Sequence, residues 1–384
     1  MDNFSLHIPT RIEFGKDKEK NIGAYLNAQN IKKVLLVYGS DRIKRDGLFD
    51  TVLSSLAAHQ ISYVEFGGIV SNPVLSKVRE GIELARAENV DAILSVGGGS
   101  VLDSSKSIAA GVCYAGDVWD LFEGKNEILA ALPIFAILTL AATGSEMNKG
   151  AVVTNEQTKQ KFAISSQHTY PTVSIINPEL MKTVTKDYLV YSAADIIAHV
   201  IETYFTAKIQ PHMQSRLAES VIKTVIETTE ILIADPDNYD ARGEFAWAST
   251  MALNGVTRVG SSGYTHPNHM IEHSLSALYN VPHGAGLSVV IPAWMKWYSE
   301  KNEIQFTRFA KEIFDKKTAK EGIEALENWF NQIGTPTKLQ QLNITPNQLD
   351  EIVVNVLDNA RYFGVSDIYT KPVIESILKN AFAQ

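Results

Sequence analysis

The chain has 384 residues, more than one hydrophobic core usually serves, so we expect two domains. Hydrophobic residues make up 45% and charged residues 20%, as in ordinary globular proteins, and the net charge of −8 argues against a nucleic-acid partner. The single cysteine, Cys113, excludes an internal disulfide and a cysteine-based zinc site, and its apolar neighbours predict a buried thiol.

The N-terminal stretch MDNFSLHIPTRIEFG lacks the basic start and the apolar run of a secretory signal. No later stretch approaches 18 uninterrupted apolar residues, so we expect no membrane span and no membrane partner. These features favour a protein of the reducing cytoplasm.

From about residue 30 to 180, short apolar runs alternate with helical patterns. The apolar runs are KKVLLVY (32–38), ISYVEF (61–66), DAILSV (91–96) and IFAILTL (134–140). Helices are expected near 46–58, 74–90 and 100–114, and later strands at 151–154, 161–165 and 172–177. Fully apolar strands that alternate with helices predict an α/β domain whose parallel sheet is covered on both faces.

After Asn177-Pro178 the pattern becomes helical up to the C-terminus. Helices are expected at 192–205, 215–234 and 241–256. We therefore expect an α/β domain at 1–182 and an all-α domain at 183–384.

Two loops follow expected strands and have the composition of a nucleotide site. SVGGGSVLDSSKS (95–107) places three glycines between a strand and a helix, where a phosphate could approach the backbone N–H groups. The spacing is not G-x-G-x-x-G, so a plain tight turn is the alternative, and Ser100 with Asp103 also matches a helix-capping box. LTLAATGSEMN (138–148) offers the hydroxyls of Thr139, Thr143 and Ser145 at the carboxyl end of a strand, where open α/β sheets bind ligands.

Acidic and imidazole side chains recur at helical spacing in the second half. Asp195 and His199 are four residues apart, as are His269 and His273, and His283 follows in VPHGAG, where proline and glycines predict a turn leaving the helix. One carboxylate with three imidazoles would suit Fe²⁺, Zn²⁺, Mn²⁺ or Ni²⁺.

The spacing alone does not select the ligands. Five imidazoles are candidates, namely His199, His266, His269, His273 and His283, and Glu202 and Glu272 are within helical reach. The alternative is a cluster of structural, hydrogen-bonded histidines.

Taken together, GGGSVLDSSK, ATGSE, AADIIAHVIETYF and HMIEHSLSALYNVPHGAG resemble the metal-dependent, iron-containing (group III) alcohol dehydrogenases. The resemblance covers essentially the whole chain and is strongest to the butanol dehydrogenase and NADPH-dependent aldehyde reductase branch. It implies a Rossmann-like dinucleotide-binding domain, an all-α domain of dehydroquinate synthase-like architecture, an active site between them, and a homodimer.

The resemblance also implies roles for individual residues. One divalent ion, Fe²⁺ or Zn²⁺, would be bound by Asp195, His199, His269 and His283, with His273 as a substrate-side or proton-relay residue. Cofactor contacts would come from Gly39, Ser40, Asn72, Gly97, Gly98, Gly99, Ser100, Asp103, Thr139, Thr143, Ser145 and Lys161. The sequence departs from the family pattern at ATGSE (usually GTGSE), at SNP (71–73, usually PNP) and at His266-Pro267-Asn268.

The stretch YGSDRIKRDG (38–47) bears on the choice of dinucleotide. Where NAD-preferring relatives carry an acid for the ribose 2′-hydroxyl, this chain has Ser40, which leaves room for a 2′-phosphate. Arg42 or Lys44 could pair with that phosphate, whereas Asp41 opposes it. We favour NADP(H), with NAD(H) as the alternative.

The expected reaction is hydride transfer between NAD(P)(H) and a small primary alcohol or aldehyde such as butanol and butanal. The metal would act as a Lewis acid on the substrate oxygen. The alternatives are a sugar-phosphate cyclase related to dehydroquinate synthase, a polyol dehydrogenase similar to glycerol dehydrogenase, and a non-catalytic metal- or nucleotide-binding protein.

Overall fold

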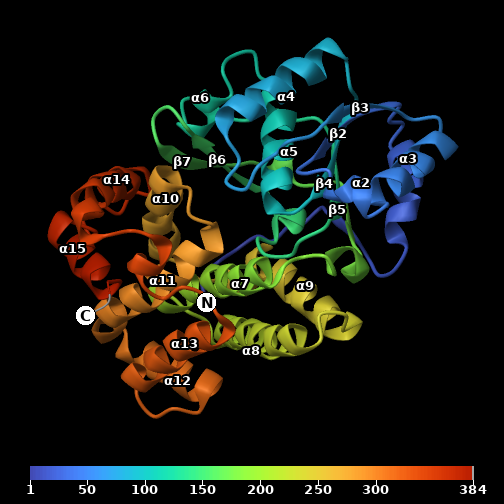
Figure 1. Cartoon of the computed structure of the whole chain (residues 1–384). Helices are drawn as coiled ribbons and strands as arrows, with labels where there is room; N and C mark the ends of the chain where they lie inside the picture. The colour runs from blue at the N-terminus through green and yellow to red at the C-terminus, as the bar shows by residue number, and fades with distance from the viewer. Residues whose placement is uncertain (383–384) are drawn as a thin grey trace. The chain divides into compact units, whose positions relative to one another are not determined.

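The computed structural model describes residues 1–382, which form two compact units (Figure 1). One unit spans His7–Thr183, and the other combines Met1–Leu6 with Val184–Gln384. The first six residues thus pack with the second unit, where the N–H of Asp2 donates to the carbonyl of Gly260.

The unit His7–Thr183 is built on a six-stranded parallel sheet with the strand order β1-β8-β5-β4-β2-β3. Its strands are β1 (Arg11–Phe14), β2 (Lys33–Tyr38), β3 (Ser62–Phe66), β4 (Ala92–Gly97), β5 (Ile134–Leu138) and β8 (Val173–Ile176). Its α-helices are α1 (Ile22–Ala28), α2 (Arg42–Arg45), α3 (Leu48–Ala58), α4 (Leu75–Ala87), α5 (Gly99–Val112) and α6 (Trp119–Phe122). Short 3₁₀ turns lie at η1 (Lys18–Asn21), η2 (Ser145–Met147), η3 (Gln167–Thr169) and η4 (Pro178–Met181).

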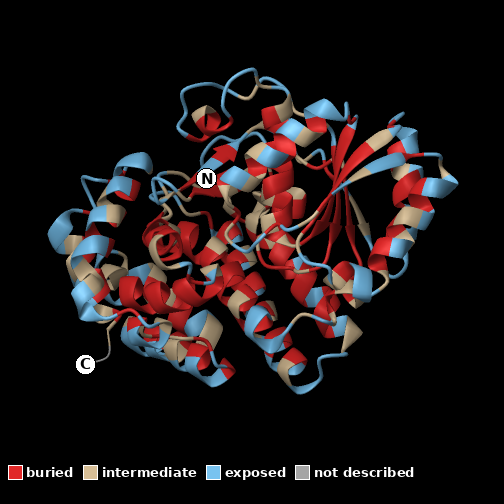
Figure 2. Ribbon diagram, turned by 45° about the horizontal axis from the view of Figure 1, so that its top comes forward, coloured by how far each residue is buried: buried red, intermediate tan, exposed pale blue. Residues whose placement is uncertain are grey.

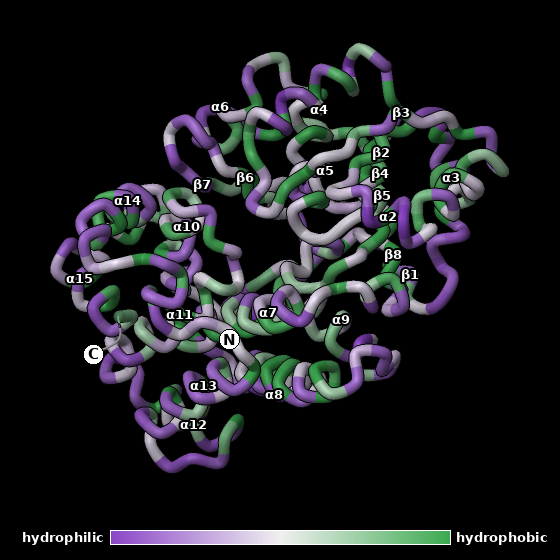
Figure 3. Tube along the Cα trace, viewed as in Figure 1, coloured by the Kyte–Doolittle hydropathy of each residue, from purple (hydrophilic) through white to green (hydrophobic). Residues whose placement is uncertain are grey.

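Helices cover both faces of this sheet, as the apolar strands predict. One core cluster joins α4, α5 and α6 to one face, and a second joins α1 and α3 to the other. Figure 2 shows the buried sheet, and Figure 3 shows hydrophobic residues gathered along β2, β4 and β5. Strands buried on both faces carry no alternation, which explains why they read as continuous apolar runs.

The three later strands separate into two sheets. β8 joins the parallel sheet between β1 and β5. β6 (Gly150–Asn155) and β7 (Gln160–Ser165) instead pair antiparallel as a two-stranded sheet, and their apolar side chains pack in the cluster of α4 and α5. This placement brings residues 150–152 next to α5.

The second unit is helical, and its described residues form no strand. Its helices are α7 (Lys186–Thr206), α8 (His212–Ala234), α9 (Tyr239–Leu253), α10 (Pro267–Tyr279), α11 (His283–Tyr298), α12 (Glu303–Phe314), α13 (Ala319–Ile333), α14 (Leu349–Tyr362) and α15 (Lys371–Asn380). Short turns lie at η5 (Val256–Arg258), η6 (Ser299–Lys301), η7 (Leu339–Leu342) and η8 (Pro346–Gln348). Helix α7 contacts α8, α9, α10, α11 and α12, so it is the centre of this unit. None of the helices within residues 1–382 combines the length and the apolar character needed to cross a membrane.

Two local predictions are wrong. Cys113 is exposed, because it lies at the C-cap of α5, where the helix leaves the core. His283 does not lie in a turn after a helix but is the first residue of α11. The turn comes earlier, where Asn280 ends α10 in the left-handed conformation with φ 52°.

Gly284 allows the start of α11 to approach α7 closely. A Cβ atom at Gly284 would lie 2.0 Å from the carbonyl oxygen of Tyr191. Because that oxygen is backbone, the clash cannot be relieved by a rotamer change.

We predict that Gly284→Ala destabilises the protein by about 1–3 kcal/mol, as overpacking does, because α11 must move away from α7. Denaturant unfolding measures the change. Gly150→Ala is the control, since its added Cβ would meet only ordinary contacts at 3.5 Å. Equal stability of the two variants would contradict the close approach of α7 and α11.

Candidate functional site

Three imidazoles converge on one oxygen of Asp195. Asp195 and His199 lie one turn apart on α7, His269 lies in the first turn of α10, and His283 begins α11. The Nε2 atoms of His199, His283 and His269 are 3.4, 3.5 and 3.7 Å from Asp195 Oδ1. The Asp195, His199 and His269 ligand atoms also lie within 4.8 Å of one another.

These distances fit a shared cation better than direct hydrogen bonds. They exceed the usual N–H···O range of about 2.7–3.2 Å. Four ligands about 2.1 Å from a central ion at tetrahedral angles would be about 3.4 Å apart. Asp195 Oδ1 and His269 Nε2 are buried and have no hydrogen-bond partner among residues 1–382. Because unpaired buried polar atoms are costly, this donor set fits one divalent cation.

Two buried glutamates hold the other ring nitrogens. Glu202 accepts hydrogen bonds at Oε2 from His269 Nδ1 (2.7 Å) and His266 Nδ1 (3.0 Å). Glu272 bonds His283 Nδ1 and also accepts from the Ser276 hydroxyl. Both glutamate side chains are fully buried. A carboxylate that engages Nδ1 leaves Nε2 of the same ring to face Asp195.

The charges of this cluster are strongly coupled. Burial alone would raise the pKa of Asp195, but His199, His283 and His269 together lower it to about 2. Burial would lower the pKa of His269, but Glu202 and Asp195 raise it to about 10. Burial lowers the pKa of His199 to about 3, against the attraction of Asp195. The buried carboxylates therefore stay ionised and favour positive charge at the centre of the cluster.

His273 and His266 flank this centre. The His273 ring is buried, and its centroid lies 5.9 Å from those of His283 and Phe363. His266 is bound by Glu202 on the outer side, and its side chain is 31% exposed. Of the five candidate imidazoles, His199, His269 and His283 are thus the three that converge on Asp195.

The glycine loop lies at the carboxyl end of β4, as the sequence predicts. Strand β4 ends at Gly97, α5 begins at Gly99, and no side chain caps that helix. A Cβ on Gly99 would lie 2.5 Å from the Thr143 hydroxyl, and one on Gly98 would lie 3.1 Å from the Leu140 Cβ. The glycines therefore let the loop after β5 approach the start of α5, and they leave an uncapped helix N-terminus of the kind that binds phosphate.

The capping-box interpretation of Ser100 and Asp103 is wrong. The N-cap of α5 is Gly98, and Asp103 faces the second loop instead. Asp103 Oδ1 accepts from the Ser145 hydroxyl (2.8 Å), and Oδ2 accepts from the N–H of Val152 (3.0 Å). Burial raises the pKa of Asp103, against the attraction of a buried lysine one turn later.

The other predicted cofactor residues lie at the same sheet edge or beside it. Thr139 directly follows β5, and its N–H donates to the carbonyl of Gly97 (3.0 Å). Lys161 on β7 donates to Asn72 Oδ1 (3.0 Å), which joins two residues that are 89 positions apart in the sequence. Gly39 and Ser40 follow β2, the neighbour of β4.

The two cations expected near a 2′-phosphate have protein partners. Lys44 pairs with the carboxylate of Glu65 and lies 3.5 Å from Asp41, and Glu65 and Tyr38 raise the pKa of Lys44. Arg42 donates to the Thr183 hydroxyl at 3.0 Å. A phosphate would have to compete with these contacts.

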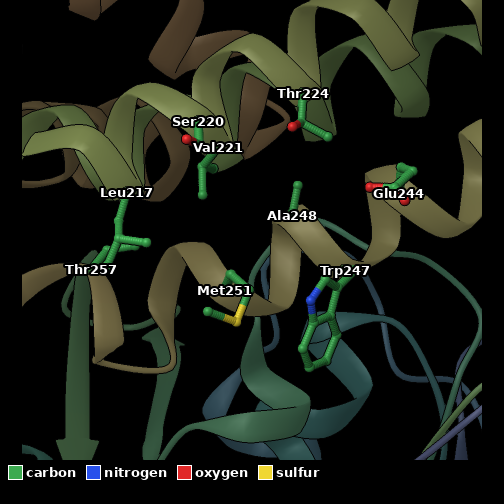
Figure 4. Close-up of a pocket in the computed structure, with 9 residues that line it drawn as sticks. All are labelled: Leu217, Ser220, Val221, Thr224, Glu244, Trp247, Ala248, Met251 and Thr257. Atoms are coloured by element: carbon green, nitrogen blue, oxygen red, sulfur yellow. The ribbon is translucent and has the colours of Figure 1, made fainter. Parts of the chain in front are cut away.

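A separate hollow lies between α8 and α9 (Figure 4). Its lining is mainly apolar and includes Leu217, Val221, Trp247 and Met251. None of the predicted metal or cofactor residues lines it.

Comparison with known proteins places these features in a family. The family model of the iron-containing alcohol dehydrogenases matches residues 9–178, and that of their C-terminal domain matches residues 189–382. The chain is 36% identical over 368 residues to NADH-dependent butanol dehydrogenase A of Clostridium acetobutylicum, covering 94% of each chain. It is 33% identical over 362 residues to the NADPH-dependent aldehyde reductase YqhD of Escherichia coli, covering 92% of each chain.

A solved structure extends the likeness to the whole fold. The crystal structure of NADH-dependent butanol dehydrogenase A from Thermotoga maritima matches with a TM-score of 0.97 and 45% identity. The match covers 100% of this chain and 99% of that one. The chain therefore belongs to the iron-containing alcohol dehydrogenase family.

Proposed function

We propose that this NAD(P)-dependent alcohol and aldehyde oxidoreductase acts on small primary alcohols, such as butanol, and on the corresponding aldehydes. The observation that carries the proposal is the convergence of His199, His269 and His283 on one buried oxygen of Asp195. Relatives of the chain are named butanol dehydrogenase and aldehyde reductase, which supports this substrate class.

Asp195, His199, His269 and His283 are the proposed ligands of one divalent ion, Fe²⁺ or Zn²⁺. When bound, the ion supplies Lewis-acid chemistry at a substrate oxygen. Asp195 provides the anionic ligand, and Glu202 and Glu272 keep the rings of His269 and His283 oriented. His273 is proposed as the neighbouring substrate-side residue, because its ring is buried beside the rings of His269 and His283.

The proposed dinucleotide site is the sheet edge formed by the ends of β2, β4 and β5. The bound nicotinamide supplies the hydride chemistry. The proposed contacts are Gly39, Ser40, Asn72, Gly97, Gly98, Gly99, Ser100, Asp103, Thr139, Thr143, Ser145 and Lys161. A preference for NADPH rests on the small side chain of Ser40, because Lys44 and Arg42 are bound by Glu65 and Thr183. The ratio of kcat/KM for NADPH and NADH tests this preference.

Side chains beside the metal cluster disfavour the cyclase alternative. A polyanionic sugar phosphate needs arginine or lysine near the metal. The side chains that converge on Asp195 are imidazoles, and the carboxylates of Glu202 and Glu272 lie behind His269 and His283. Comparing kcat/KM for glycerol with kcat/KM for butanol distinguishes a polyol dehydrogenase from the proposed alcohol dehydrogenase.

We predict that the purified protein oxidises NADPH or NADH with butanal and holds one divalent ion per chain. Asp195→Ala and His283→Ala should each lose the ion and reduce kcat/KM on the order of a thousandfold, because the ligand set is broken. Absorbance at 340 nm and elemental analysis measure the two effects.

The matched control for these ligand variants is His273→Gln, beside the cluster. It should keep the ion and lower kcat by about 100-fold, as loss of a proton-transfer group does. Full activity of Asp195→Ala, or an ion-free active enzyme, would refute the proposed metal site.

We predict that Glu202→Gln and Glu272→Gln each weaken metal binding about 10- to 100-fold, because each changes the partner of a ligand imidazole. Competition with a chelator measures the affinity without any turnover. Glu244→Gln, at an exposed position of α9, is the control and should bind metal as the parent protein does. Unchanged affinity in both buried variants would show that these carboxylates do not orient the ligands.

We further propose that the enzyme works in the cytoplasm as a homodimer. A single cysteine suits a reducing compartment. Light scattering should give twice the chain mass of 42.3 kDa, and a monomer at working concentration would contradict the dimer.

A further inference from the structure

Helix α5 carries a lysine that is completely enclosed. The side chain of Lys106 has a relative exposure of 0%. Its ammonium group lies within hydrogen-bond distance of five oxygens, all from residues 145–150. They are Ser145 O (2.7 Å), Gly150 O (2.8 Å), Ser145 Oγ (2.9 Å), Asn148 O (2.9 Å) and Asn148 Oδ1 (3.1 Å). Lysine is almost never fully buried without such partners, so this oxygen cage around Lys106 is a specific arrangement.

The oxygen cage is joined to Asp103 through Ser145. The Ser145 hydroxyl accepts from Lys106 and donates to Asp103 Oδ1. The second oxygen of Asp103 accepts from the N–H of Val152, just beyond the caged segment. Lys106 and Asp103, one turn apart on α5, therefore hold residues 145–152 against that helix at four residues, 145, 148, 150 and 152.

The same segment carries proposed cofactor contacts. Thr143 faces Gly99 at the start of α5, and its hydroxyl accepts from the N–H of Ser145 (3.2 Å). A shift of Ser145 would therefore move Thr143 and change the orientation of Asp103. Lys106 itself is buried beneath this surface, so it acts through these residues.

We propose that Lys106 is a positioning residue for the dinucleotide: its ammonium group fixes residues 145–150 against α5 and so keeps Thr143, Ser145 and Asp103 in the arrangement that binds the cofactor. This inference rests on the proposed cofactor site. It extends that site to a residue that does not line it.

The test is the dissociation constant of NADH, and in parallel of NADPH, measured by fluorescence without substrate. Lys106→Met keeps the length of the side chain and removes the charge, and we expect at least a tenfold weaker binding. Its metal content should match that of the parent protein, because Asp195 and its neighbours belong to the other compact unit. Ser104→Ala is the control on the same helix, since the Ser104 hydroxyl is buried and has no hydrogen-bond partner within residues 1–382. It should bind within twofold of the parent protein.

Ser145→Ala tests the connection and stays informative if Lys106→Met does not fold. It removes the hydroxyl between Lys106 and Asp103 but keeps the carbonyl, so we expect a smaller loss of affinity, in the same direction. In the double variant the two losses should combine to less than their sum, because both act through one network. Additive losses, or parent-like binding by Ser145→Ala, would overturn the connection.

The pH dependence of NADH affinity distinguishes this positioning role from a general effect of Lys106 on the stability of the fold. Burial lowers the pKa of Lys106 to about 8, against the attraction of Asp103 and Glu146. Lys161 is the further charged group that acts on Asp103. NADH affinity of the parent protein should therefore fall as pH rises through 8, while that of Lys106→Met should not show this fall. Folded Lys106→Met that binds NADH as the parent protein does would overturn the inference, whereas a parent protein that binds neither dinucleotide would overturn the proposed function.

Discussion

The helical unit depends on a buried carboxylate, Asp195, on which three imidazoles converge. Asp195 Oδ1, on a side chain of α7, has three imidazole nitrogens around it at 3.4–3.7 Å and no hydrogen-bond partner among residues 1–382. Burying such a charge is unfavourable unless a counter-charge is present. The packing of α10 and α11 on α7 brings the imidazoles of His269 and His283 to Asp195. The helix contacts that form the core of this unit therefore also form the proposed metal site.

The α/β unit contains the opposite arrangement, in which a buried cation, the ammonium group of Lys106, is surrounded by oxygens. Lys106 is enclosed by residues 145–150, and Asp103 lies one turn before it on α5. In both units a charged side chain within a helix organises polypeptide that is distant in sequence. The difference is that Asp195 faces imidazoles of α7, α10 and α11, whereas Lys106 binds mainly backbone carbonyls of one loop.

The sequence predicted helices and strands well where hydrophobic residues or charged pairs recur at a regular spacing. It predicted individual side-chain contacts less well. Continuous apolar runs identified the buried strands, and i,i+4 spacing identified Asp195 with His199 as a pair. The same spacing did not distinguish His269 from His273, because the choice depends on where α7 lies. The helix-capping prediction for Asp103 was wrong, because Asp103 instead binds Ser145, which is 42 residues away. The pairing of Lys44 on α2 with Glu65 on β3 was not predicted either. Pairings set by tertiary packing leave no local signal.

The contact at Gly284 has a mechanical consequence. Tyr191, whose carbonyl oxygen faces Gly284, lies one turn before Asp195, and His283 immediately precedes Gly284. The backbone of α11 thus lies directly against the backbone of α7. Because the contact is between backbone atoms, a change of side-chain rotamers elsewhere does not alter it. The spacing between His283 and Asp195 should for that reason vary little when neighbouring side chains change their rotamers.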